Sequence, residues 1–281
     1  MNEKIAVVTD STCDLTSDLL EGKDIHVVPL KVVYADRVYH DKIDITPQEV
    51  YDRLEEEIPT TSVPTPQELK EKLLELKEKK YTHVLAIHIS TGLSGTCNAM
   101  RLMSKEVEGL TVEVIDSKAL SMGLGRLVLY AHELVEKGLK FDEIVQKTMD
   151  KVNDIKVFFV VATLKYLVKG GRIGKVEGTI GGLLKIKPII SINENGVYYT
   201  YEKTRGRKKS LERLAQIVME KIKEGRYIVD VMHAAAKDEA KALYDEFSKN
   251  KNIEETSFGE IGPVLGVHTG PGLVGVTITK I

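Results

Sequence analysis

One short segment of the sequence combines several groups that could bind or react with a ligand. The segment ISTGLSGT, residues 89–96, follows an apolar run and precedes a helical pattern. Free backbone N–H groups at such a helix start bind anions, and the hydroxyls of Ser94 and Thr96 add donors. Ser94 can equally be an ordinary helix N-cap. GLSGT differs from the nucleophile elbow G-x-S-x-G only at Thr96, where the motif has glycine, so Ser94 is also a candidate nucleophile.

Two other segments offer hydroxyls and a histidine. Thr60-Thr61-Ser62 lies in an extended stretch bounded by Pro59 and Pro64, where three hydroxyls could face a ligand or form a plain polar linker. Near the C-terminus, HTGPG at 268–272 combines glycines with a histidine that can donate or accept a proton. The alternative is a loop with a structural histidine.

Charged residues form the remaining candidates. The run KTRGRKK at 203–209 holds five cations and could dock an acidic partner or a phosphate, or could be a solvated face leading into a helix. Asp10 and Asp116 each end a predicted strand, where ligands approach an open α/β sheet. Both carboxylates could equally satisfy loop N–H groups.

Composition excludes several classes of function. The 281 residues hold 40 Lys and Arg against 42 Asp and Glu, a formal net charge of -2, so we expect no nucleic-acid partner. The sequence has no P-loop, no complete dinucleotide fingerprint and no H-E-x-x-H, so it predicts neither a cofactor nor a metal. No apolar run is long enough for a membrane helix, and the N-terminus does not resemble a signal peptide. Cys13 and Cys97 lack redox spacing, which favours reduced thiols in a cytoplasmic protein.

Strand and helix patterns alternate in the first half and must position these groups. Predicted strands fall at about 5–9, 84–89 and 112–115, and a further run over 25–34 is broken by Pro29. Capping boxes at Thr46 and Thr65 start helices that we expect to run to about residues 57 and 79. Further helices are expected at 94–105 and 120–137. This order predicts a parallel α/β sheet up to about residue 155.

The second half has a different pattern. It shows strands at 157–163, 227–232, 255–258 and 274–278, an apolar stretch at 184–192, and one helical face over 211–222. Asn195-Gly196 between two β-branched runs predicts a hairpin. We therefore predict a parallel-sheet domain over 1–155 and a mixed-sheet α/β domain over 156–281. The segment 60–80 is a candidate for packing on the second domain.

Taken in order, these segments resemble the DegV family, fatty-acid-binding proteins that serve bacterial fatty acid kinase. Each motif is weak alone, but the ordered set is specific and spans nearly the whole chain. The motifs are TDST at 9–12, PTTS at 59–62, LSGT at 93–96, Asp116-Ser117, KGGRI at 169–173, LKIKP at 184–188, RGRKK at 205–209 and HTGPG at 268–272.

The resemblance implies a two-domain α/β fold with a long-chain fatty acid, such as palmitate or oleate, in an apolar tunnel between the domains. It implies a carrier without a cofactor, catalytic residues or stable membrane insertion. In kinase-coupled members, a separate ATP-binding subunit phosphorylates the presented acyl group, and the basic run with Arg205 and Arg207 matches that docking role. The positions matching the carboxylate site are Thr61, Ser62, Ser94, Gly95, His268 and Thr269.

Physical chemistry agrees with a binding protein. Hydroxyls, a helix start and a histidine could hold a half-buried carboxylate without a Lys or Arg charge, and this is what we expect of the site. Each buried methylene contributes about 0.8 kcal/mol, so affinity would come from the chain and orientation from the polar cluster. The alternative hypothesis is a serine hydrolase or acyltransferase with Ser94 as nucleophile and His268 as base.

Overall fold

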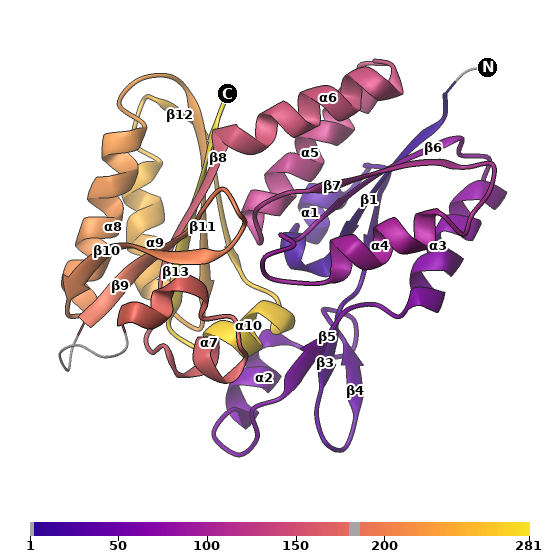
Figure 1. Ribbon diagram of the computed structural model, residues 1–281. Helices are drawn as coiled ribbons and strands as arrows, with labels where there is room; N and C mark the ends of the chain where they lie inside the picture. Colours follow the sequence, from indigo (N-terminus) through magenta and orange to yellow (C-terminus); the bar gives the residue numbers. More distant parts are fainter. Residues whose placement is uncertain (1–2, 180–185) are drawn as a thin grey trace.

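Two β-sheets lie side by side and form the frame of the protein, seen in the computed structural model of Figure 1, which describes residues 3–179 and 186–281. The first sheet is parallel, with strand order β2-β1-β6-β7. Its strands are β1 (Ile5–Asp10), β2 (Ile25–Val28), β6 (His83–His88) and β7 (Thr111–Asp116). All six residues of β1 are buried, as expected of a strand covered on both faces. The predicted parallel sheet is confirmed.

Helices cover both faces of this sheet. α3 (Pro66–Glu78) and α4 (Thr96–Ser104) pack on one face, while α5 (Met122–Glu136) contacts β1 and β6 from the other. Both predicted capping boxes are present, at the starts of α2 (Pro47–Arg53) and α3. α1 (Ser17–Leu20) is a single turn, and α6 (Phe141–Lys151), which we did not predict, follows α5.

The second sheet is mixed, as predicted, with order β10-β9-β8-β13-β11-β12. Its strands are β8 (Ile155–Val160), β9 (Ile186–Ile192), β10 (Tyr198–Arg205), β11 (Tyr227–Ala234), β12 (Ile253–Glu260) and β13 (Leu273–Lys280). All pairs are antiparallel except β11 with β12. The predicted hairpin joins β9 and β10, with Gly196 at a φ of 74°. Leu184 and Lys185 of the LKIKP motif lie outside the described residues.

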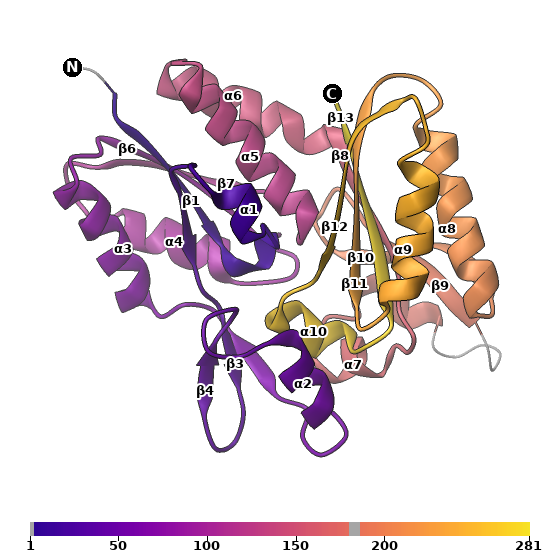
Figure 2. The same ribbon diagram turned by 180° about the vertical axis from the view of Figure 1, so that it is seen from behind.

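Helices on opposite sides of this sheet play different parts. α8 (Arg207–Lys221) and α9 (Lys237–Phe247) cover its outer face, as Figure 2 shows, and their apolar residues form a core of their own with β11 and β13. α5 covers the inner face, so one helix packs between the two sheets. The predicted division after residue 155 falls at the start of β8. We did not predict α9 or the short helix α10 (Pro263–Thr269).

A small third sheet connects the two halves of the chain. β3 (Lys31–Val33), β4 (Val38–His40) and β5 (Thr60–Ser62) form it, in the order β4-β3-β5. The predicted break of the run 25–34 at Pro29 is confirmed, but the two parts lie in different sheets, since β2 ends before Pro29 and β3 begins after Leu30. β3 and β5 contact α10, which also packs on α2 and α7 (Lys165–Lys169). Of the segment 60–80, β5 reaches α10, whereas α3 packs on the first sheet.

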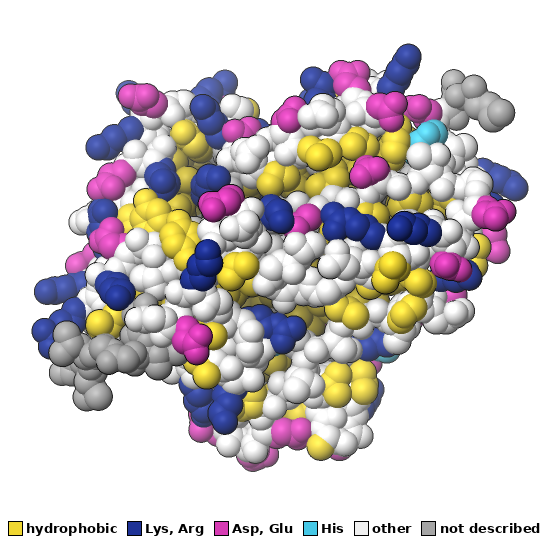
Figure 3. Space-filling model, viewed as in Figure 1, with side chains coloured by type: hydrophobic (Ala, Val, Ile, Leu, Met, Phe, Trp, Pro, Cys, Tyr) yellow, Lys and Arg dark blue, Asp and Glu magenta, His cyan; other side chains and the backbone are white. Residues whose placement is uncertain are grey.

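The surface carries charges of both signs. In Figure 3, cations and anions are interspersed over the visible face. Among the described residues, no helix is both long enough and apolar enough to cross a membrane. Three short 3₁₀ helices, η1 (Ser11–Cys13), η2 (Val152–Asp154) and η3 (Gly174–Thr179), complete the elements of the described chain.

Candidate ligand-binding site

A small cavity lies where β5, α10 and the loop after β6 meet. Its volume is about 30 Å³, room for very few atoms. Four of the six predicted site residues line it, and they come from three segments far apart in the chain. The polar lining residues are Thr61, Ser94, Arg172, His268 and Thr269, and the apolar ones are Leu30, Ile89, Leu93, Leu120, Tyr198, Val264 and Leu265.

His268 is the buried centre of this polar group. Its Nε2 lies 2.7 Å from the Thr61 Oγ1, and its Nδ1 has no hydrogen-bond partner among the described residues. Burial, together with the nearby positive charge of Arg172, lowers the pKa of His268 to about 4. A side chain on residue 170 would collide with Nδ1, so Gly170 is needed for the ring to fit. The histidine sits in the last turn of α10, so the alternative of a loop does not hold for His268 itself, although the glycines after it do lie in the short turn between α10 and β13.

Two aspartates hold the loop that carries Ser94. Asp10 accepts hydrogen bonds from the backbone N–H of Ile89 at 3.0 Å and from Thr12. Asp116 accepts from the backbone N–H of Thr91 at 3.2 Å. Both carboxylates thus satisfy loop N–H groups, which was the alternative interpretation of these residues, and neither lines the cavity.

Ser94 lacks the contacts of a catalytic nucleophile. Its hydroxyl lies 2.9 Å from the Thr96 hydroxyl and accepts a hydrogen bond from the Thr96 N–H. Within the described residues it has no hydrogen bond to His268, whose Nε2 meets Thr61 instead. Because His268 Nδ1 is unpartnered, no third group orients the ring as a base. The geometry favours binding over the hydrolase alternative.

Ser62 and Gly95 lie outside this cavity. Ser62 is exposed and follows Thr61 on β5, so its side chain points to the opposite face of the strand. Gly95 is exposed at the N-terminus of α4. Neither residue belongs to the cavity lining.

Arg172 is the lining residue that sequence reasoning missed. Its NH1 donates to the Gly170 carbonyl at 2.7 Å and its Nε to the Leu93 carbonyl at 3.3 Å. No carboxylate among the described residues pairs with it. The cavity thus contains an Arg charge, which we did not expect at a carboxylate site. Arg172 was visible within the KGGRI motif, but the two glycines before it pointed only to the end of a helix.

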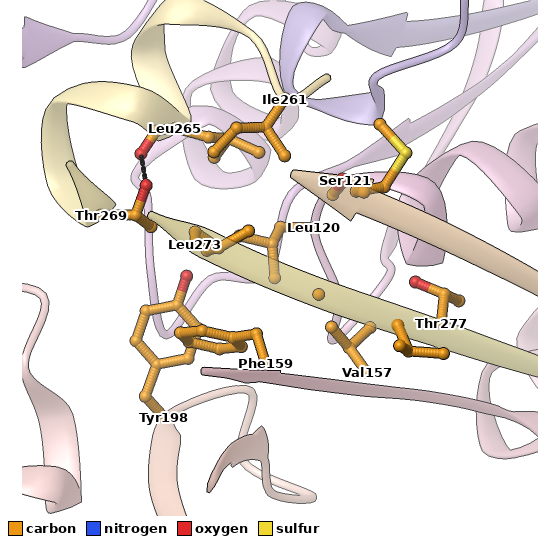
Figure 4. A pocket seen from close by; sticks show the side chains of 13 residues that line it. Leu120, Ser121, Val157, Phe159, Tyr198, Ile261, Leu265, Thr269, Leu273 and Thr277 are labelled. Atoms are coloured by element: carbon orange, nitrogen blue, oxygen red, sulfur yellow. Dashed lines mark hydrogen bonds between the residues drawn. The ribbon is translucent and has the colours of Figure 1, made fainter. Parts of the chain in front are cut away.

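A second cavity of about 30 Å³, here called the inner cavity, adjoins the first. The two share Leu120, Tyr198, Leu265 and Thr269. Figure 4 shows Thr269 and Tyr198 near one end of the inner cavity, and Thr277 and Val157 at the other. Apolar side chains dominate its lining, which also includes Phe159, Met232, Ile261, Leu273, Val276, Ser121 and Gly275. The Thr269 hydroxyl donates to the Leu265 carbonyl at 3.0 Å, so it is already used within α10.

The basic run lies away from both cavities. Arg205 ends β10 and is exposed, whereas Arg207 makes a two-pronged ion pair with Glu239 of α9, with a closest contact of 2.6 Å. No group of three or more His, Cys, Asp or Glu in the described residues is arranged to hold a metal ion.

Fold and site together define a class: an α/β protein with two sheets and an amphipathic cavity between them. One end of the cavity offers a cation and neutral donors, and the other offers apolar side chains. Such a site suits a ligand with an anionic head and an apolar tail.

Comparison with known proteins gives the family. Residues 4–280 match the family model described as uncharacterised protein of the DegV family, and the chain belongs to this family. A DegV domain-containing protein of Clostridium acetobutylicum is 46% identical over 278 residues, covering 99% of both chains. A solved structure of a fatty-acid-binding DegV family protein from Thermus thermophilus matches with a TM-score of 0.93 and 34% identity, covering 99% of this chain and 100% of that one. A stearic acid-binding protein from Eubacterium ventriosum matches with a TM-score of 0.89 and 29% identity, covering 99% and 98%.

Proposed function

We propose that this protein is a non-catalytic carrier that binds a long-chain fatty acid such as palmitate or oleate. The observation that carries the proposal is the pair of adjoining cavities, which are polar at Arg172, His268, Thr61 and Ser94 and mainly apolar beyond Leu120 and Tyr198. The fatty acid binding of its structural neighbours supports the same ligand class. The two cysteines are free and buried, which fits a role in the reducing cytoplasm.

The polar end suits a carboxylate. Arg172 supplies a half-buried charge that no described carboxylate neutralises, and such a cation is stabilised by an anion beside it. Because the pKa of His268 lies near 4, the ring is neutral at physiological pH and acts as a hydrogen-bonding group. Thr61 and Ser94 add hydroxyls on either side. In this proposal Ser62 and Gly95 have no direct contact with the carboxylate, and Thr269 lies where the head and tail regions meet.

The apolar end supplies the affinity. Each methylene removed from water contributes about 0.8 kcal/mol, so a long chain outweighs the single charged contact at its head. The two cavities are far smaller than such a chain, and their lining side chains must separate to admit it.

Native mass spectrometry of the purified protein, followed by organic extraction, tests the proposal. We expect a mass increment equal to that of an extracted long-chain fatty acid, and binding of added palmitate or oleate by protein stripped of lipid. A protein that carries no lipid and binds neither acid would contradict it.

We further propose that the carrier presents its acyl group to a separate ATP-binding kinase subunit. Arg205 supports this role, since it is exposed and its side chain has no ion pair or hydrogen bond among the described residues. Arg207 is engaged by Glu239, so its part in docking would require that ion pair to open. Arg205→Ala should leave fatty-acid affinity unchanged and lower partner-dependent acyl phosphorylation. Lys208→Ala, at an exposed cation close by, is the matched control, and equal loss in both variants would argue against a specific role for Arg205.

A further inference from the structure

The inner cavity ends at a defined row of side chains on the second sheet. In the register of the sheet, Gly275 of β13 lies between Met232 of β11 and Phe159 of β8. The next row places Thr277 between Asp230 and Val157. Residues in one row point to the same face, so Asp230 stands directly beside Thr277 at the cavity end. Thr277 and Val157 belong to the lining, and Asp230 does not.

Asp230 is locked in a buried ion pair with Arg126 of α5. The Nε of Arg126 lies 3.0 Å and 3.1 Å from the two carboxylate oxygens, and its NH2 lies 2.6 Å from one of them. The side chain of Arg126 is 5% exposed and that of Asp230 is fully buried. Ser257 donates a further hydrogen bond to Asp230, and Glu255 contacts Arg126 at 2.8 Å.

α5 brings this pair to the end of the cavity. A side chain on Gly123 would collide with Val157, which shows that the helix touches the sheet at this row. Arg126 follows about one helical turn later and therefore lies over Asp230. Beyond Thr277 the space between α5 and the sheet is thus occupied by the buried charges of Arg126 and Asp230, and Glu255, which is half exposed, connects Arg126 to the surface.

The pair opposes a longer ligand far more strongly than extra methylenes favour it. Each additional buried methylene improves affinity about fourfold. Separating a buried ion pair costs roughly two to three orders of magnitude in an equilibrium constant, because both charges lose their partner away from water.

We propose that Arg126 and Asp230 set the upper limit of the acyl chain length that this protein accepts. The inference rests on the proposed function and deepens it. A chain grows along β13 past Leu273 and Gly275 and stops at the row of Thr277.

The experiment compares lipid-stripped wild type with R126A/D230A, which removes both charges together. Affinities are measured for the saturated acids from laurate to behenate. For the wild type we expect a rise with each added carbon up to one length and a sharp fall beyond it. In the double variant the chain length at which affinity falls should be longer, and the affinities for shorter acids should not change. Two more accommodated methylenes give roughly 15-fold tighter binding of the first acid beyond the wild-type limit.

A second double variant keeps the experiment decisive if R126A/D230A does not fold. R126M/D230M keeps apolar bulk at both positions, and such replacement of a buried ion pair is often tolerated. The flexible side chains should yield to a longer chain and shift the limit in the same direction. R213A/E202A removes an ion pair between α8 and β10, away from the cavity, and should leave the limit unchanged.

Gly275→Ala tests the path of the chain. The added methyl would meet the Phe159 Cβ at 3.5 Å and the Leu273 side chain at 3.6 Å, ordinary contacts that the fold accommodates. It should weaken binding of the long acids about fourfold or more, since it displaces at least one methylene, and should affect laurate less. A wild type that binds no acid of the series would overturn the proposed function itself. A wild type with a sharp limit that neither folded double variant moves would overturn only the role of the ion pair.

Discussion

Two arginines lie at opposite ends of the pair of adjoining cavities, and their surroundings are opposite. Arg172 at the polar end donates to two backbone carbonyls and has no carboxylate partner among the described residues. Arg126 beyond the apolar end is held by Asp230 and Glu255 and is almost fully buried. A charge that is already paired is a structural element, whereas a half-buried charge that lacks an anion is ready to bind one. The partners, and not the residue type, decide the role.

The largest effect is expected when the paired arginine is removed alone. Arg126→Ala leaves Asp230 buried without its cation and should lower the free energy of unfolding by about 3–5 kcal/mol. Denaturant unfolding measures this loss. Arg172→Met is the matched control and should change stability little, and equal losses in both variants would erase the contrast between the two ends.

The reverse contrast is expected in binding. Arg172→Met removes the one charged side chain that the described residues bring to the polar end, and should weaken fatty-acid affinity by about 1.5–3 kcal/mol, or roughly 10- to 100-fold. Titration of lipid-stripped protein with oleate provides the measurement. Arg172→Lys keeps the charge but loses the planar donor geometry, so its fatty-acid affinity should lie between those of the wild type and Arg172→Met. Unchanged affinity in the Met variant would remove Arg172 from the site.

The pH dependence of stability tests whether the polar end buries a neutral His268. Its pKa is about 4 in the folded protein, below the ordinary value of 6.5. The unfolded chain therefore binds the proton more readily, so stability is present above about pH 6.5 and falls as the pH drops toward 4. From pH 7 to pH 5, the protonation of this histidine should lower the free energy of unfolding by about 2 kcal/mol. Over the same pH range, the His268→Gln variant should lose about 2 kcal/mol less stability than the wild type. Parallel curves of unfolding free energy against pH for the two proteins would contradict this expectation.

The smallest effect concerns the two serines that sequence reasoning treated alike. Ser94→Ala removes a cavity hydroxyl and should weaken fatty-acid binding by about 1 kcal/mol, a several-fold change. Ser62→Ala, on the exposed face of β5, should have no effect in the same titration. Equal weakening by both would place Ser62 back in the site.

Much of the frame was predictable, because buried strands and helices have recognisable hydrophobic patterns and capping residues in the sequence. The continuous apolar runs of β1 and β6 and the capping box before α3 led directly to a parallel sheet and its helices. The elements that were missed give weaker signals. α10 has seven residues and includes a proline and a glycine, and β4 has three residues.

The site was predicted in part, since motifs identify segments but not the directions of side chains. Thr61 and Ser62 are adjacent and chemically alike, and only the pleat of β5 separates them. Arg172 reaches the cavity through the packing of the turn after α7 against His268 and the Leu93 carbonyl, a tertiary arrangement that no local pattern reports.

The small volume of the two cavities has a kinetic consequence. A long chain can enter only when packed side chains around Leu120, Tyr198 and Leu265 move apart. For the proposed ligand, uptake and release would then be timed by the opening of the protein, and the uptake rate would level off at high lipid concentration. A carrier of this kind would hold its cargo through many encounters with membranes and give it up mainly where a partner promotes the opening.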